Sequence, residues 1–103
     1  MSKELIGAAV AKQALDIIEK TPEILNVLNE NLNMPNIPLP VMDGEVFWQV
    51  LAETGRYKLE QNHITKHARL LEIKDGTAYR IAWGGLAKME KALDEIIRLK
   101  NKY

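Results

Sequence analysis

The chain contains no cysteine, and this absence removes several classes of chemistry at once. Disulfides, thiolate metal sites and cysteine nucleophiles are all excluded. Histidine occurs only at His63 and His67, whose spacing of four lies in strand-like sequence with no third metal ligand in view. The sequence therefore predicts no metal site and no cofactor.

Serine is also scarce, since Ser2 is the one serine of the chain. No G-x-S-x-G sequence, phosphate-binding loop or dinucleotide fingerprint occurs. The carboxylates are spread over the polar faces of the expected helices, and no pair of them sits among apolar neighbours that would shift a pKa. We therefore expect a protein that is not an enzyme and has no catalytic residues.

Long hydrophobic runs are missing as well. The longest uncharged apolar run extends from Leu5 to Ala11, whereas a membrane-spanning helix needs roughly 20 such residues. No signal-like apolar stretch follows Met1, and cysteine is absent. These absences predict no membrane partner and favour a cytoplasmic protein.

What the chain does contain is typical of a folded globular protein. Its 103 residues are 47% hydrophobic and 27% charged, which suits one domain spanning residues 1–103 with an independent core. Changes in hydrophobic period divide this domain into three parts. We expect a helical hairpin over 1–33, a proline-rich connection over 34–43, and an α-β-β-β-α unit over 44–103.

The first two parts are punctuated by capping residues and prolines. Residues 3–20 carry apolar side chains at helical spacing, and a second helix starts with Thr21 as its cap and Pro22 in its first position. This helix ends before Pro35, which biases the preceding residue away from helical geometry. The alternation of prolines with apolar residues over 34–42 predicts extended chain.

The third part begins with an ambiguous segment. Phe47, Val50 and Leu51 follow helical spacing, which predicts a short helix between Asp43 and Gly55. A hairpin that turns at Asp43 and Gly44 is the alternative.

From Tyr57 onward the period is two, and "YKLEQ", "ITKHARLLEI" and "TAYRIAWG" predict a three-stranded antiparallel meander. Residues 86–103 return to helical period and predict a C-terminal helix packed on this sheet. The expected fold class is α+β.

Two assumed turns, at Asn62–His63 and at Asp75–Gly76, assign the strand side chains to faces. The pairs they predict are Lys58 with His67, Arg56 with Arg69, Leu71 with Arg80, and Arg69 with Ala82. The core face then holds Tyr57, Leu59, Ile64, Ala68, Leu70, Tyr79, Ile81 and Trp83. The opposite face holds the cationic set Arg56, Lys58, His67, Arg69 and Arg80.

Charge is distributed unevenly along the chain. Residues 1–53 hold three basic and eight acidic side chains, and residues 54–103 hold eleven basic and six acidic ones. The cationic set is typical of a nucleic-acid-binding surface. The alternatives are a solvated outer face, or a face that packs against the acidic half. Gly84 and Gly85 precede the last helix and supply no side-chain cap, so an anion could dock at its first backbone N–H groups. The alternative is that the two glycines only connect the strand to the helix.

A small non-catalytic binding protein is the expected function. Its partner would be another protein or a second copy of the chain, contacted through the first helix and residues 34–48. Within that region Ile37, Leu39 and Trp48 are the candidate protein-contact residues, since apolar and aromatic side chains beside prolines suit a contact surface. Nucleic-acid binding by Arg56, Lys58, His67, Arg69 and Arg80 is the alternative function.

Overall fold

Helices and strands follow one another in the order expected of an α+β protein. The structure is a computed structural model that describes residues 7–32, 39–41 and 47–102. Its elements are α1 (Ala8–Lys20), a short 3-10 helix η1 (Pro22–Ile24), α2 (Leu25–Leu32), β1 (Leu39–Val41), β2 (Trp48–Thr54), β3 (Tyr57–Asn62), β4 (Ala68–Lys74), β5 (Thr77–Gly84) and α3 (Leu86–Lys102). The predicted α+β class is confirmed.

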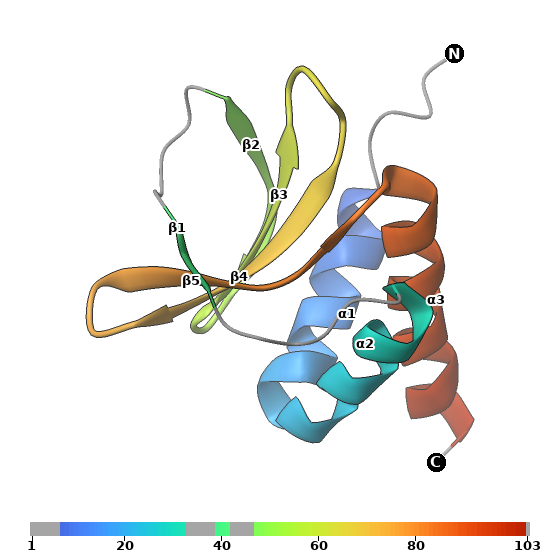
Figure 1. The fold of residues 1–103 in the computed structure, drawn as a ribbon. Helices are drawn as coiled ribbons and strands as arrows, with labels where there is room; N and C mark the ends of the chain where they lie inside the picture. Colours follow the sequence, from blue (N-terminus) through green and yellow to red (C-terminus); the bar gives the residue numbers. More distant parts are fainter. Residues whose placement is uncertain (1–6, 33–38, 42–46, 103) are drawn as a thin grey trace.

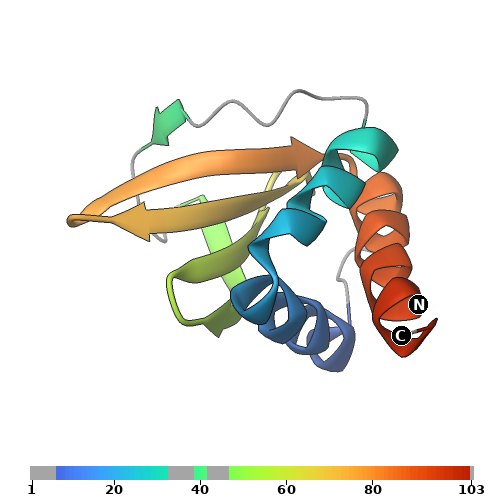
Figure 2. The same ribbon diagram turned by 90° about the horizontal axis from the view of Figure 1, so that it is seen from below.

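The strands form one antiparallel sheet of five strands in the order β1-β5-β4-β3-β2. The predicted meander is its centre, made of β3, β4 and β5. The prediction of three strands is wrong because β1 and β2 extend the sheet at its two edges. Figures 1 and 2 show that the sheet is strongly curved and that the helices lie together on one side of it.

Strand β2 replaces the short helix predicted for this segment. The strand has a bulge at Leu51, between the pairs Val50–Glu60 and Ala52–Leu59. An extra residue in a strand interrupts the alternation of side chains, so the apolar positions mimic helical spacing. Asp43 and Gly44, where the alternative hairpin would turn, lie outside the described residues.

Strand β1 comes from the proline-rich connection. Residues 39–41 pair with β5, which confirms extended chain for these three residues. Pro40 has no backbone N–H, and an edge strand tolerates it because one side of the strand makes no ladder hydrogen bonds. The other residues of the predicted connection, 34–38 and 42–43, lie outside the described residues.

The β4–β5 hairpin turns where predicted. Asp75 and Gly76 both have positive φ, 52° and 78°, as a tight two-residue turn requires. The pairs Ile73–Ala78 and Leu71–Arg80 confirm the predicted register next to this turn.

The β3–β4 hairpin has a longer loop than the predicted two-residue tip. Lys58 pairs with Leu71 rather than with His67, and Glu60 rather than Arg56 pairs with Arg69. The shift is by an even number of residues, so each side chain keeps its predicted face.

A bulge in β5 overturns the predicted position of Trp83. Leu71 pairs with Arg80 but Leu70 pairs with Ala82, so Ile81 is the extra residue. Beyond it the alternation is reversed: Ala82 turns to the helices, and Trp83 pairs with Arg69 on the opposite face. Ile64, also predicted in the core, is 72% exposed in the β3–β4 loop.

The core lies between the helices and the near face of the sheet. Its largest fully buried apolar side chains in the helices and strands are Leu15, Ile18, Leu28, Tyr57, Leu59, Leu70, Met89, Leu93 and Ile96. Helix α1 packs against β2 and β3, whereas α3 packs on α1 and α2 and reaches the sheet at β5. Thr21 occupies the N-cap position of η1 with Pro22 after it, as predicted, but the Thr21 side chain makes no capping hydrogen bond.

The turn between β2 and β3 depends on a glycine. Gly55 has φ +56°, and a Cβ at this position would lie 2.3 Å from Glu19 Oε1 of α1. We expect Gly55→Ala to lower the free energy of unfolding by about 1–2 kcal/mol. Alanine is strained in the left-handed backbone conformation, and its Cβ would also press against the Glu19 carboxylate. Urea denaturation measures the effect. Gly85→Ala is the control, since a Cβ there has no neighbour within 4 Å, and an equal loss in the two variants would contradict the explanation.

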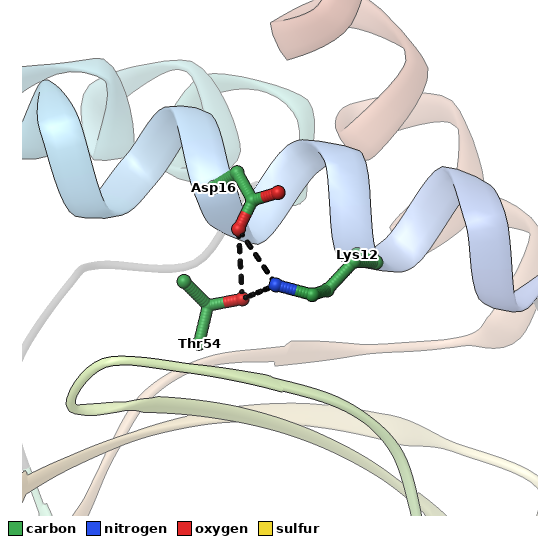
Figure 3. A network of polar contacts seen from close by, with 3 residues as sticks. All are labelled: Lys12, Asp16 and Thr54. Carbon is green, nitrogen blue, oxygen red and sulfur yellow. Dashed lines mark hydrogen bonds and ion pairs between the residues drawn. The ribbon is translucent and has the colours of Figure 1, made fainter.

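A polar network joins α1 to the end of β2 (Figure 3). Lys12 Nζ donates to Asp16 Oδ1 and to Thr54 Oγ1, each at 2.9 Å, and Thr54 Oγ1 donates to Asp16 Oδ1 at 3.0 Å. The hydrogen bonds from Lys12 and Thr54 hold the pKa of Asp16 below its usual value of 3.8. The network therefore favours the ionised carboxylate in the folded protein.

Stability should follow the ionisation of Asp16. Because its pKa is lowered on folding, its contribution is present above pH 3.8 and is lost as the pH falls through the folded-state pKa. We expect Asp16→Asn to lower the melting temperature at neutral pH and to match the unsubstituted protein in strong acid. Thermal melts across pH measure this, with Asp94→Asn on α3 as the control. A difference that persists in strong acid would contradict the linkage.

Candidate functional site: a tryptophan face on the sheet

Polar and aromatic side chains gather on the face of the sheet that points away from the helices. Glu60 of β3 pairs with Arg69 of β4, which pairs with Trp83 of β5, so the three form a row across the strands. Further side chains extend this row along the strands. We call the whole set the tryptophan face, made of Trp48, Lys58, Glu60, His67, Arg69, Arg80 and Trp83.

The centre of the tryptophan face is a buried ion pair. Arg69 Nε donates to Glu60 Oε1 at 2.8 Å, and the two side chains are 7% and 0% exposed. Lys58 Nζ lies 3.9 Å from the other oxygen, Glu60 Oε2. Removing two charges from water is costly, so a pair of this kind is weak evidence for stability.

Arg69 also contacts the first tryptophan. Its guanidinium carbon lies 3.9 Å from the ring centroid of Trp48, which comes from the edge strand β2. A guanidinium stacked on an indole is a favourable cation–π contact. Arg69 therefore ties three strands together through Glu60, through Trp48 and through its own backbone.

Two side chains, an arginine and a histidine, lie beside the ring of the second tryptophan. Arg80 lies over the Trp83 ring at 5.2 Å from its centroid, and the ring of His67 lies 5.4 Å from it, tilted by 53°. Gly84 allows α2 to pack beside Trp83, since a Cβ there would lie 2.9 Å from Leu32 Cδ2.

Two buried atoms of the tryptophan face have no hydrogen-bond partner in the part of the chain that the structure describes. These are Glu60 Oε2, an acceptor, and Trp83 Nε1, a donor. Buried polar atoms in proteins are nearly always paired, because leaving one unpaired costs free energy. Such atoms indicate a group that the described residues do not provide.

The β3–β4 loop holds His67 in place through Asn62. The Asn62 side-chain oxygen accepts hydrogen bonds from the backbone N–H groups of Ile64 and Thr65 at 2.8 and 2.9 Å. The backbone of Asn62 donates to His67 at 2.8 Å, and Lys66 adopts a φ of 66° within the loop. An asparagine that bonds the following backbone in this way is a common turn device.

The structure brings together four of the five predicted nucleic-acid-binding residues. Lys58, His67, Arg69 and Arg80 all belong to the tryptophan face. Arg56 lies at the other end of the sheet, where Arg56 Nε is 3.0 Å from Glu72 Oε2 and the guanidinium carbon is 5.3 Å from the Tyr57 ring centroid. Binding of nucleic acid by this set stays a prediction.

The structure describes two of the three predicted protein-contact residues, and these two lie on opposite edges of the sheet. Ile37 lies outside the described residues. Leu39 pairs with Arg80 from edge strand β1, and Trp48 lies on the opposite edge strand, β2. Two exposed apolar side chains accompany them at the end of the sheet near Trp48, Phe47 at 55% and Ile64 at 72% exposure.

Sequence reasoning missed Glu60 and Trp83 as site residues. Alternation along β3 places Glu60 on the same face as Lys58, but its burial depends on tertiary packing, which the sequence pattern does not show. Trp83 was assigned to the core because the bulge at Ile81 was not recognised; two apolar residues beside an arginine in "YRIAW" are the signal that could have raised the question. The described residues hold no group of three His, Asp or Glu side chains that could bind a metal ion.

A separate hollow of about 440 Å³ lies among the helices, between α1, η1 and α3. Ile17, Ile24 and Leu99 give it apolar walls, with Glu23 and Lys100 as charges of opposite sign. None of its lining residues in the described chain carries a buried polar atom without a partner. The tryptophan face is therefore the stronger candidate site.

Comparison with known proteins identifies no relative. No protein-family model matches the chain, and neither a curated protein nor a solved structure is significantly similar to it. Within the described ranges, no helix is long and apolar enough to cross a membrane.

Proposed function

We propose that this chain is a non-catalytic binding protein and that its partner contacts the tryptophan face. The observation that carries the proposal is a pair of buried atoms with no hydrogen-bond partner among the described residues, Trp83 Nε1 and Glu60 Oε2, the second of which has Lys58 Nζ as an ion-pair partner at 3.9 Å. Both lie on the face that the helices leave uncovered, as Figures 1 and 2 show for the sheet as a whole. A bound group with one donor and one acceptor would satisfy both atoms.

The residue types of the tryptophan face support the same proposal. Tryptophan and arginine are the residues most enriched among those that dominate binding energy at interfaces. Here two tryptophans are each covered by an arginine, Trp48 by Arg69 and Trp83 by Arg80. The stacked pairs fix the side chains before any partner arrives, which lowers the entropy lost on binding.

Self-association is a second candidate function, favoured by one specific observation. Phe47 and Ile64 are the exposed large apolar side chains of the described chain, and the N–H of His63 beside Ile64 donates to the carbonyl of Phe47 at 2.8 Å. Adjacent exposed apolar side chains suit a contact between copies. If this holds, the mass in solution should rise with concentration, and Ile64→Asp should abolish the rise.

The proposed function is tested by capture from a cell lysate. The baits are the unsubstituted protein, the double variant Arg80→Glu/Trp83→Ala, and the control Arg98→Glu, which makes the same charge change on the exposed surface of α3. Retained protein and retained nucleic acid are both identified. We expect the double variant alone to lose the retained partner. Equal retention by the double variant, in folded form, would contradict the proposal.

A further inference from the structure

Three groups around Trp83 can each donate a hydrogen bond or carry a positive charge. The indole N–H of Trp83 is buried and has no acceptor among residues 7–32, 39–41 and 47–102. The guanidinium of Arg80 contacts the Trp83 ring and forms no ion pair with a carboxylate of the described chain. The ring of His67 contacts the same indole. Arg80 and His67 thus both lie beside the indole that carries this N–H, and hydrogen-bond donors without an acceptor suit an oxyanion.

The balance of charge on the tryptophan face supports an anionic ligand. Lys58, Arg69 and Arg80 carry three positive charges, against the carboxylates of Glu60 and of Glu53, which pairs with Lys58 from β2. The Glu60 carboxylate is held by Arg69 at 2.8 Å, so Arg69 serves as a positioning residue rather than as an anion ligand. Arg80 then remains as the cation best placed to meet an anion.

The aromatic rings distinguish between kinds of anionic partner. Trp48 and Trp83 alternate with Arg69 and Arg80 across one curved face, and this mixture of rings and cations is typical of surfaces that bind single strands. Bases of a single strand can stack on indoles, whereas the bases of a duplex are stacked on one another. A base edge also carries donors and acceptors that could satisfy Glu60 Oε2. An acidic protein segment would use the cations but not the rings.

We infer that the tryptophan face binds single-stranded nucleic acid, with a phosphate held by Arg80, His67 and the Trp83 N–H and with bases stacked on the two indoles. This inference rests on the proposed function, because it names the partner of the same face. Helix α3 begins at Leu86, three residues beyond Trp83, and adds the positive end of a helix dipole to this part of the chain.

The experiment measures fluorescence anisotropy of labelled oligonucleotides across a salt series. The probes are single-stranded RNA, single-stranded DNA and duplex DNA of mixed sequence, with unlabelled polyglutamate as competitor. We expect the single strands to bind with a dissociation constant of about 1–100 µM and to bind more tightly than the duplex. With one or two phosphate contacts, the logarithm of the affinity should fall with the logarithm of salt at a slope of about −0.7 to −1.4.

Three variants separate the elements of the inference. Arg80→Gln should weaken binding about fivefold to tenfold and should make the salt slope shallower by about 0.7. Trp83→Phe keeps a ring but removes the N–H, and Trp83→Leu removes the ring as well, so the second should lose about tenfold more affinity than the first. Arg98→Gln is the matched control on α3, where Arg98 pairs with Glu95, and this variant should bind as the unsubstituted protein does.

Three results would overturn the inference. They are no binding of single strands at low salt by the folded protein, equal weakening by Arg80→Gln and Arg98→Gln, and binding of polyglutamate in place of the oligonucleotides. In each case the lysate capture described above still decides the proposed function. Capture that depends on the tryptophan face would leave that function standing with a partner of another class.

Discussion

Arg69→Met is expected to lower the free energy of unfolding by about 3–5 kcal/mol, because it leaves a buried carboxylate without its hydrogen-bonded cation. Glu60 is 0% exposed, and its Oε1 atom accepts from Arg69 Nε at 2.8 Å. Methionine keeps much of the volume of the side chain, so loss of packing contributes little. The substitution also removes the stack of Arg69 on Trp48. Denaturant unfolding followed by circular dichroism measures the loss.

A second substitution separates the charge from the packing. In the double variant Arg69→Met/Glu60→Gln the uncompensated charge is gone, and we expect part of the lost stability to return. Arg98→Met is the control on α3, where an exposed pair with Glu95 should change stability by less than about 1 kcal/mol. A loss at Arg69 as small as that at Arg98 would show that the Glu60–Arg69 pair is solvated in solution.

Leu71→Ala is expected to cost about 2–5 kcal/mol, even though Leu71 lies on the face that the helices leave uncovered. Leu71 pairs with Lys58 and Arg80 and is 0% exposed. A leucine on a solvated sheet face would lose far less on truncation, since most of its surface would already be in water. The large loss would therefore show that the far face of the sheet is packed.

Two other positions calibrate this measurement. Leu70→Ala, in the core between sheet and helices, should cost a similar amount, because Leu70 is also 0% exposed. Ile64→Ala, at 72% exposure, should change stability by less than about 0.5 kcal/mol. If Leu71→Ala resembles Ile64→Ala rather than Leu70→Ala, the far face is open to water and the burial of its polar atoms is wrong.

Much of the fold follows from local signals in the sequence. The period of two from Tyr57 onward and the Asp75–Gly76 turn placed β3, β4 and β5 correctly, because left-handed turn residues and alternation act over a few positions. The helical period over residues 86–103 predicted the last helix, whose apolar face buries Met89, Leu93 and Ile96. These elements carry their own pattern, so no tertiary information was needed.

The errors come from bulges, which local patterns do not reveal. One extra residue at Leu51 gave β2 a helix-like spacing, and one at Ile81 sent Trp83 to the wrong face. Both bulges are determined by how the strand meets its neighbours. Predicting them requires the pairing partner, which a single sequence does not supply.

The candidate site was predicted only in part for the same reason. The alternation of side chains along the strands placed Lys58, Arg69 and Arg80 on one face correctly, although the predicted pairing of β3 with β4 was shifted by four residues. The burial of Glu60 beside Arg69 depends on the curvature of the sheet and on side chains from three strands. The sequence suggested an exposed basic face, whereas the structure shows a buried ion pair flanked by tryptophans.

The most direct test of the tryptophan face as the binding site uses its two indole groups. The chain has two tryptophans, so a ¹H–¹⁵N spectrum contains two indole cross-peaks that report on Trp48 and Trp83. On addition of a short single-stranded RNA of mixed sequence, we expect the Trp83 indole peak to move, together with the backbone peaks of His67, Arg69 and Arg80. Indole peaks that stay fixed, while peaks from the helices move or none moves, would contradict the assignment of binding to this face.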